Sequence, residues 1–215
     1  MKKENLKNLY TSVSLIIAFA FWTISLYFID VRPIGPQNSA VGFATINVFI
    51  HNLTGTNMTL YNITDWLGLI PIAVMFGFAL LGLIQWIKRK ELKLVDYSIF
   101  VLGGFYIVVL TIYILFEFLA VNYRPVLING YLEVSYPSST TMLVMCVMPT
   151  AIMQFNSRIK NPTLKRYISL LIMVFIIFMV AGRLISGVHW FSDIIGGLLI
   201  SAGLVLMYQF VRKLK

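Results

Sequence analysis

Residues 182–193, GRLISGVHWFSD, place three functional side chains between two long apolar runs. These are Arg183, His189 and Asp193. If the run from Trp190 onward is helical, the histidine and the aspartate share a face near its first turn. A carboxylate that accepts a hydrogen bond from one imidazole nitrogen leaves the other free as a base or nucleophile, and a guanidinium suits an oxyanion such as phosphate. A loop histidine followed by a helix-capping aspartate would have the same spacing, so other features must decide.

The composition indicates whether this chain lies in water or in a membrane. The 215 residues are 59% hydrophobic and only 12% charged, and the mean hydropathy is +0.86, so we predict an integral membrane protein. An apolar helix needs roughly 20 residues to cross the bilayer. The sequence predicts an all-α, polytopic membrane protein with six such spans, at about residues 9–29, 66–87, 97–120, 138–155, 167–181 and 190–210.

The basic residues predict orientation and argue against nucleic acid as a partner. The net charge is +9, but the lysines and arginines lie in short clusters at the ends of the apolar runs. All but three of the 17 fall on the side of the N-terminus, which predicts that both termini are cytoplasmic. The three exceptions are Arg32, Arg124 and Arg183, on the extracytoplasmic side. The last two lie in the short outer loops that flank the later spans, which places the predicted active site at the extracytoplasmic end.

The remaining segments predict a single domain over residues 1–215, with a structured outer loop at 31–65. Within it, residues 39–53 are moderately apolar and could form a helix in the membrane interface, capped by Ser39. A single cysteine, Cys146, excludes an intramolecular disulfide and a cysteine-based metal site, and two histidines are too few for a multi-histidine zinc cage. We therefore expect neither a cofactor nor a metal.

Three sequence motifs lie at the outer ends of the predicted spans. They are Glu117-x6-Arg124-Pro125, Pro137-Ser138-Ser139-Thr140 and Gly182-Arg183-x5-His189-x3-Asp193. In these blocks the chain resembles the type 2 phosphatidic acid phosphatase superfamily, whose membrane lipid phosphatases carry Lys-x6-Arg-Pro, Pro-Ser-Gly-His and Ser-Arg-x5-His-x3-Asp. The third block matches most specifically, and the first two are degraded.

The resemblance implies roles for individual residues. His189 would attack phosphorus to form a phosphohistidine, and Asp193 would orient its imidazole. Arg124, Arg183 and the turn at residues 138–139, with Ser138 and Ser139, would hold the phosphoryl oxygens. Phosphoryl transfer depends mainly on positioning and charge stabilisation, which such groups supply without a metal.

Three departures from the family pattern affect the expected chemistry, of which Gly182 for serine costs only one possible hydrogen bond. Thr140 stands where the family has the histidine that protonates the leaving group, and a hydroxyl does not release a proton near neutral pH. General acid catalysis is worth about a hundredfold to ten-thousandfold, so we expect impaired activity, least impaired for a pyrophosphate, which expels a good leaving group. Glu117 replaces a phosphate-binding lysine; it could instead orient Arg124.

The sequence thus predicts a lipid phosphatase or pyrophosphatase of the plasma membrane that acts on its outer face. A polyprenyl substrate such as undecaprenyl pyrophosphate, or a phosphatidyl-type lipid phosphate, would suit it. An inactive relative that only binds lipid phosphate, or a variant disabled by an introduced Thr140, would carry the same pattern. Arg124 and Arg183 could also be headgroup anchors, and His51 could replace the missing acid. A transporter is disfavoured, because no ionisable residue stands at the middle of any span.

Overall fold

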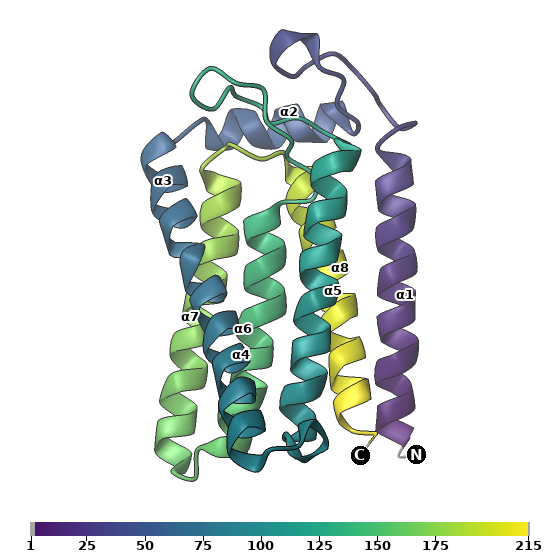
Figure 1. The fold of residues 1–215 in the computed structure, drawn as a ribbon. Helices are drawn as coiled ribbons and strands as arrows, with labels where there is room; N and C mark the ends of the chain where they lie inside the picture. Colours follow the sequence, from purple (N-terminus) through teal and green to yellow (C-terminus); the bar gives the residue numbers. More distant parts are fainter. Residues whose placement is uncertain (1–2, 215) are drawn as a thin grey trace.

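The computed structural model describes residues 3–214, which are all-helical apart from three isolated β-bridges. The elements in order are α1 (Lys3–Ser25), η1 (Pro36–Asn38), α2 (Ala44–Thr54), α3 (Met58–Leu67), α4 (Leu69–Arg89), η2 (Leu92–Leu94), α5 (Tyr97–Leu119), α6 (Ser139–Arg158), α7 (Pro162–Ile185) and α8 (Phe191–Arg212). The long helices form one bundle with the chain ends together, and α2 lies across the opposite end (Figure 1). We name these the terminal end and the α2 end.

Five helices are long and apolar enough to cross a membrane, so the described chain has the composition of a multi-pass membrane protein. They are Glu4–Ser25, Met58–Arg89, Tyr97–Leu119, Pro162–Ile185 and Phe191–Arg212. The predicted fourth span, α6, is not among them. It packs against α4, α5, α7 and α8, and its polar residues Thr141, Thr150 and Gln154 are buried. A helix surrounded by other helices contacts little lipid, so its sequence need not be uniformly apolar.

Several predicted boundaries were wrong, and two of them lie beside the site. The loop expected at residues 31–65 ends early, because α3 begins at Met58 after an N-cap in which Asn57 accepts from the backbone N–H of Leu60 at 2.9 Å. Because α3 contains threonine and asparagine residues, the hydropathy pattern does not reveal it as a helix. The helix predicted at 167–181 extends to Ile185, so Arg183 lies in the last turn of α7 and not in a loop. A helical position fixes its backbone more firmly than a loop would.

The helix expected at residues 39–53 exists, but its start was also predicted wrongly. It begins at Ala44, and the residue at its N-cap is Phe43, with a left-handed φ of 51°. Ser39 instead follows the short helix η1 and caps nothing in α2. Helix α2 contacts α8 and spans the end of the bundle, so it covers the start of α8 (Figure 1).

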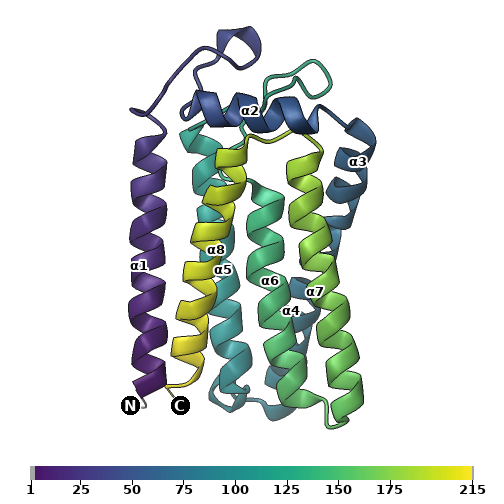
Figure 2. The same ribbon diagram turned by 180° about the vertical axis from the view of Figure 1, so that it is seen from behind.

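Helix α8 is fixed along its length by α1, the most extensive helix pair in the bundle (Figure 2). The hydroxyl of Ser12 donates to the carbonyl of Gly203 at 2.7 Å, and a Cβ at Gly203 would lie 2.9 Å from Ile16 Cγ1. Only glycine permits this approach. The first turn of α8, which carries Asp193, is therefore part of a rigid element.

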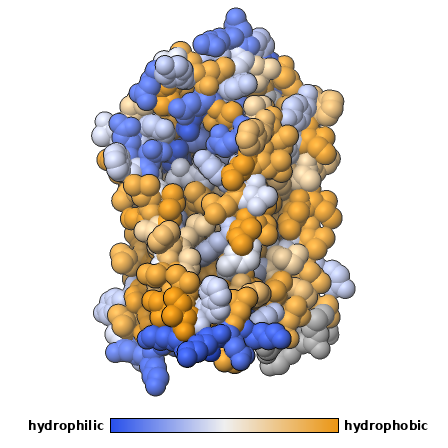
Figure 3. All heavy atoms as spheres, viewed as in Figure 1, coloured by the Kyte–Doolittle hydropathy of each residue, from blue (hydrophilic) through white to orange (hydrophobic). Residues whose placement is uncertain are grey.

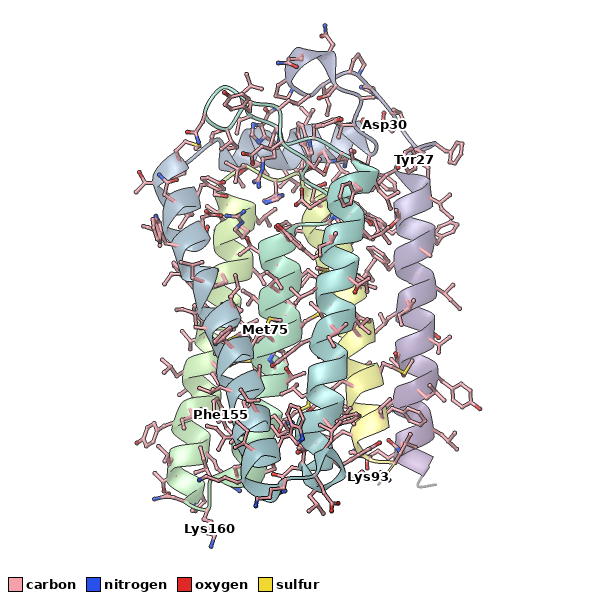
Figure 4. The ribbon with its side chains drawn as sticks, in the orientation of Figure 1. Tyr27, Asp30, Met75, Lys93, Phe155 and Lys160 are labelled. Carbon is pink, nitrogen blue, oxygen red and sulfur yellow. The ribbon has the colours of Figure 1, made fainter. Side chains whose placement is uncertain are left out.

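Polar and apolar surfaces divide the molecule into bands. The visible face is hydrophobic in the middle and hydrophilic at both ends (Figure 3). Lys93 and Lys160 lie at the terminal end, and Asp30 lies at the α2 end (Figure 4). The apolar band between them matches a hydrocarbon layer.

Candidate active site

The connection between α7 and α8 determines where His189 lies. Gly187 has a φ of +65°, and a Cβ there would lie 1.7 Å from the carbonyl oxygen of Gly55. The backbone N–H of Asn57 donates to the carbonyl of Ser186 at 2.9 Å. The turn is thus pressed against the segment between α2 and α3. As a result the His189 side chain points into the protein and is only 3% exposed.

Asp193 lies beside the imidazole, four residues later, in the first turn of α8. Its Oδ2 accepts from the backbone N–H of Trp190 at 2.9 Å, and its Oδ1 accepts from Nδ2 of Asn122 at 3.2 Å. Oδ2 lies 3.7 Å from Nδ1 of His189, which is longer than a hydrogen bond. Catalytic hydrogen bonds are often long without substrate and shorten in the complex. The carboxylate is therefore fixed by a helix cap and an amide within reach of the ring.

Two guanidiniums meet at the other ring nitrogen. Nη1 of Arg124 lies 3.2 Å from Nε2 of His189, and Nη2 of Arg183 lies 3.1 Å from the same atom. One arginine comes from the loop after α5 and the other from the last turn of α7. Both are buried, at 8% and 1% exposure. Neither points into lipid, so the structure does not favour a role as headgroup anchors.

A tyrosine ring and two carboxylates support the arginines. The Tyr61 ring of α3 lies 4.9 Å from the Arg183 guanidinium carbon and 5.5 Å from that of Arg124. Nε of Arg124 pairs with Glu133 at 3.0 Å, and Nη1 of Arg183 lies 3.5 Å from Oδ1 of Asp65. Two like charges in a buried position need such partners. The cluster therefore retains two positive charges beside one imidazole.

The electrostatic environment keeps His189 neutral. Burial, followed by the charges of Arg124 and Arg183, lowers the pKa of His189 well below its usual value of 6.5. Because guanidiniums only donate hydrogen bonds, Nε2 is the acceptor and Nδ1 carries the proton. The lone pair of Nε2 is thus directed at the two positive charges, where an oxyanion would be stabilised.

The second sequence block lies at the start of α6. Ser138 is fully buried, and its backbone N–H donates to the carbonyl of Asp193 at 3.1 Å. Ser139 and His189 line the same small cavity of about 10 Å³. Thr140 instead packs towards the α3–α4 junction, where its Cγ2 would lie 3.5 Å from a Cβ atom placed on Gly68. The structure thus brings Ser139 to the histidine and turns Thr140 towards another helix.

Glu117 lies near the end of α5 and lines the same small cavity. Within residues 3–214 the carboxylate that pairs with Arg124 is Glu133, and no ion pair joins Glu117 to that arginine. The pairing with Arg124 that was suggested for Glu117 is therefore made by Glu133.

His51 lies apart from the guanidiniums. Its ring contacts that of Trp190 at 5.6 Å between centroids, and burial lowers its pKa. Its described contact is therefore with the indole that follows His189. Among the described residues, no group of three His, Cys, Asp or Glu side chains is arranged to hold a metal ion.

Four residues near the site were absent from the sequence analysis: Tyr61, Asp65, Asn122 and Glu133. Asn122 and Glu133 stand within a dozen residues of Arg124 in the same loop, and polar residues in that loop could have signalled them. Tyr61 and Asp65 belong to α3, which was predicted as loop. No sequence pattern pairs a residue of α3 with one of α7, so only the tertiary structure reveals them.

A large apolar groove of about 840 Å³ runs between α4 and α5. On α5 its lining extends from Ile99 to Tyr113, roughly 21 Å of helix axis. Tyr113 also lines the small cavity that contains His189, and its hydroxyl is within electrostatic range of Glu117, Arg124 and Asp65. The groove therefore reaches the site at one end and continues through the apolar band at the other.

Comparisons with known proteins show a similar sequence region and a similar fold. The PAP2 superfamily model matches residues 117–215. A transmembrane PAP2-type phosphatidylglycerolphosphate phosphatase from Bacillus subtilis, known from its crystal structure, has the same fold with a TM-score of 0.65. At 17% identity, the match covers 96% of this chain and 98% of that one. No curated protein matches the sequence significantly.

The resemblance predicted from the three motifs is confirmed, since the family match begins at Glu117 and contains all of them. Residues 117–215 match the PAP2 superfamily, and almost the whole chain has the same fold as a solved transmembrane PAP2-type phosphatase.

Proposed function

We propose that this protein is an integral membrane phosphatase that hydrolyses a lipid phosphate or pyrophosphate through a phosphohistidine at His189. One observation carries the proposal: the acceptor nitrogen of a neutral, buried imidazole lies 3.2 and 3.1 Å from the guanidiniums of Arg124 and Arg183. A nucleophile and two charges that bind oxyanions thus share one point, which is what phosphoryl transfer requires.

The steps follow from the directions of these groups. A bound phosphoryl group would draw the guanidiniums from Nε2 to its oxygens, and this frees the lone pair to attack phosphorus. Backbone N–H groups at the start of α6, near Ser138 and Ser139, would bind further phosphoryl oxygens. Asp193 would stabilise the Nδ1–H as the ring gains positive charge. Water then releases phosphate from the histidine.

The apolar groove supports a lipid as substrate. A chain lying between α4 and α5 would have its phosphorylated head beside Tyr113 and the arginines, and its tail in contact with hydrocarbon. The related Bacillus subtilis protein is a phosphatidylglycerolphosphate phosphatase. For this chain both a phosphatidyl-type monophosphate and a polyprenyl pyrophosphate fit the proposal.

Membrane orientation belongs to the same proposal. With α6 counted as the sixth span, the lysine-rich terminal end would face the cytoplasm, and the site at the α2 end would face the outside of the plasma membrane. Lys93 and Lys160 mark the terminal end (Figure 4). Helix α2 would then lie in the outer interface and cover the site.

The proposal is tested by phosphate release and by an acid-labile phosphoenzyme, measured on purified protein with lipid monophosphates and pyrophosphates. We expect His189→Ala to abolish both signals, with a loss of at least about 10³-fold. His51→Ala, which changes the other histidine, should retain both. Full turnover in His189→Ala would exclude a phosphohistidine there. Tight lipid phosphate binding without any turnover of the unaltered chain would instead identify a binding protein.

A further inference from the structure

The absence of a histidine at position 140 raises the question of which group protonates the leaving oxygen. In an in-line displacement at phosphorus, that oxygen lies opposite the attacking Nε2 of His189. It also carries the lipid tail. If the tail follows the α4–α5 groove, the leaving oxygen lies towards Tyr113, which lines both the groove and the small cavity and is within electrostatic range of Asp65.

The Asp65 carboxylate is linked to the nucleophile through Arg183. Oδ1 of Asp65 lies 3.5 Å from Nη1 of Arg183, whose Nη2 lies 3.1 Å from Nε2 of His189. The Arg183 guanidinium therefore lies between Asp65 and the imidazole. Its side chain is 56% exposed, whereas that of Arg183 is 1% exposed, so it borders the opening of the cluster.

The position that carries the acid in the family motif adjoins the same helix turn. A Cβ atom placed on Gly68 would lie 3.5 Å from Cγ2 of Thr140 and 2.9 Å from the carbonyl oxygen of Asp65. Thr140 of α6 and the backbone of Asp65 thus lie against the same turn at the α3–α4 junction. The charged and titratable groups around Asp65 are Arg183 of α7, Tyr61 of its own helix, Tyr113 of α5 and Arg124 of the following loop.

Resting on the proposed function, we infer that Asp65 is the leaving-group acid of this protein, in place of the histidine that Thr140 replaces. As the bond from Nε2 of His189 to phosphorus forms and the bond from phosphorus to the lipid oxygen breaks, the carboxylic proton of Asp65 moves to that oxygen. A lipid alcohol leaves. The Asp65 carboxylate then takes a proton from the water that attacks the phosphohistidine, and inorganic phosphate and neutral His189 result.

The chemistry of a carboxyl group predicts how this acid differs from a histidine. A carboxyl group is protonated mainly at acid pH, whereas an imidazole still carries its proton closer to neutrality. Hydrolysis of a monophosphate should therefore increase as the pH falls from 7 towards 5. Hydrolysis of a pyrophosphate needs little help from an acid and should depend less on this group.

The deciding experiment compares Asp65→Asn with the unaltered chain, on one polyprenyl alcohol presented as its monophosphate and as its pyrophosphate. We expect kcat for the monophosphate to fall about 10²-fold to 10⁴-fold and that for the pyrophosphate to fall less than about tenfold. The increase of monophosphate turnover at acid pH should disappear. Thr140→His in the Asp65→Asn background should restore monophosphate turnover, with its optimum nearer neutral pH.

Glu117→Gln is the matched control, since Glu117 is a second exposed carboxylate within electrostatic range of Tyr113 that does not pair with Arg183. It should leave the ratio of monophosphate to pyrophosphate turnover unchanged. An equal loss on both substrates in Asp65→Asn would overturn the inference and reduce Asp65 to a partner of Arg183. A selective monophosphate loss in Glu117→Gln alone would assign the acid to Glu117. If the unaltered chain cleaves neither substrate, the proposed function fails as well.

Discussion

Arg124 and His189 are 65 residues apart in the chain, yet Nη1 of the arginine lies 3.2 Å from Nε2 of the histidine in a buried site. Arg183 approaches the same atom from another element at 3.1 Å. Two arginines from distant parts of the chain thus converge on one imidazole nitrogen.

Arg183→Lys should lower kcat/KM by about 10²-fold to 10³-fold. Lysine keeps the charge, but it has one nitrogen where Arg183 uses Nη1 towards Asp65 and Nη2 towards His189, and it lacks the planar fork that binds phosphoryl oxygens. Steady-state phosphate release measures the effect. Arg32→Lys is the control, because Arg32 is an exposed outer-loop arginine that pairs with Asp30. A similar loss in both variants would contradict a specific role for Arg183.

Tyr61→Leu should raise KM about tenfold, and Tyr61→Phe should stay close to the unaltered protein. The ring faces both guanidiniums, at 4.9 and 5.5 Å, and cation–π contacts of buried groups are worth about 2 kcal/mol. Phenylalanine keeps the ring and leucine removes it. An equal change in the two variants would attribute the effect to the hydroxyl and not to the ring. Substrate titrations give KM for each.

Asp193→Ala should reduce the free energy of unfolding by about 2–4 kcal/mol, because the Trp190 backbone N–H and the Asn122 amide lose their buried acceptor. Asp193→Asn keeps an acceptor oxygen and should cost less. Unfolding in detergent, followed by the loss of helical signal, provides the comparison. Both variants should also lose turnover, since neither presents a carboxylate to Nδ1 of His189. Equal stability of all three proteins would contradict the assigned cap.

The histidine also predicts a pH dependence of stability. Its pKa is lowered in the folded protein, first by burial and then by Arg124 and Arg183, so the unfolded chain binds the extra proton more readily. Stability should therefore fall as the pH drops below 6.5. The effect amounts to about 2 kcal/mol at pH 5 relative to His189→Asn, which lacks the titrating group. Thermal unfolding at pH 7.5 and pH 5 measures it, and parallel losses in both proteins would refute it.

Gly103→Leu should raise KM for a long-chain lipid phosphate about tenfold or more, and it should not affect a short-chain analogue. Gly103 lines the groove between α4 and α5, and a Cβ there meets nothing within 4 Å, so the new side chain would occupy the groove. Gly77→Leu is the control, since Gly77 of α4 is equally open and does not line the groove. If the long-chain KM is unchanged in Gly103→Leu, the tail lies elsewhere.

Much of this arrangement could be predicted from the sequence. The apolar runs predicted the long helices, because a segment that crosses hydrocarbon must satisfy its backbone hydrogen-bonding groups internally, as a helix does. The apolar run from Trp190 onward predicted a helix with Asp193 near its first turn, and the structure has Asp193 in the first turn of α8, whereas His189 lies just before that helix. Boundaries failed where polar residues hid a helix, as at Met58, and where a helix extended past its most apolar part, as at Ile185.

What the sequence alone determined is therefore local: which segments are helices in a membrane, which family motifs they carry, and that Thr140 stands where that motif has histidine. The tertiary structure alone decided the partners. Tyr61 and Asp65 meet Arg183 because α3 packs against α7, and Glu133, not Glu117, pairs with Arg124. Helical periodicity relates residues three or four apart, whereas contacts between distant segments depend on how whole helices pack, and no local pattern encodes that.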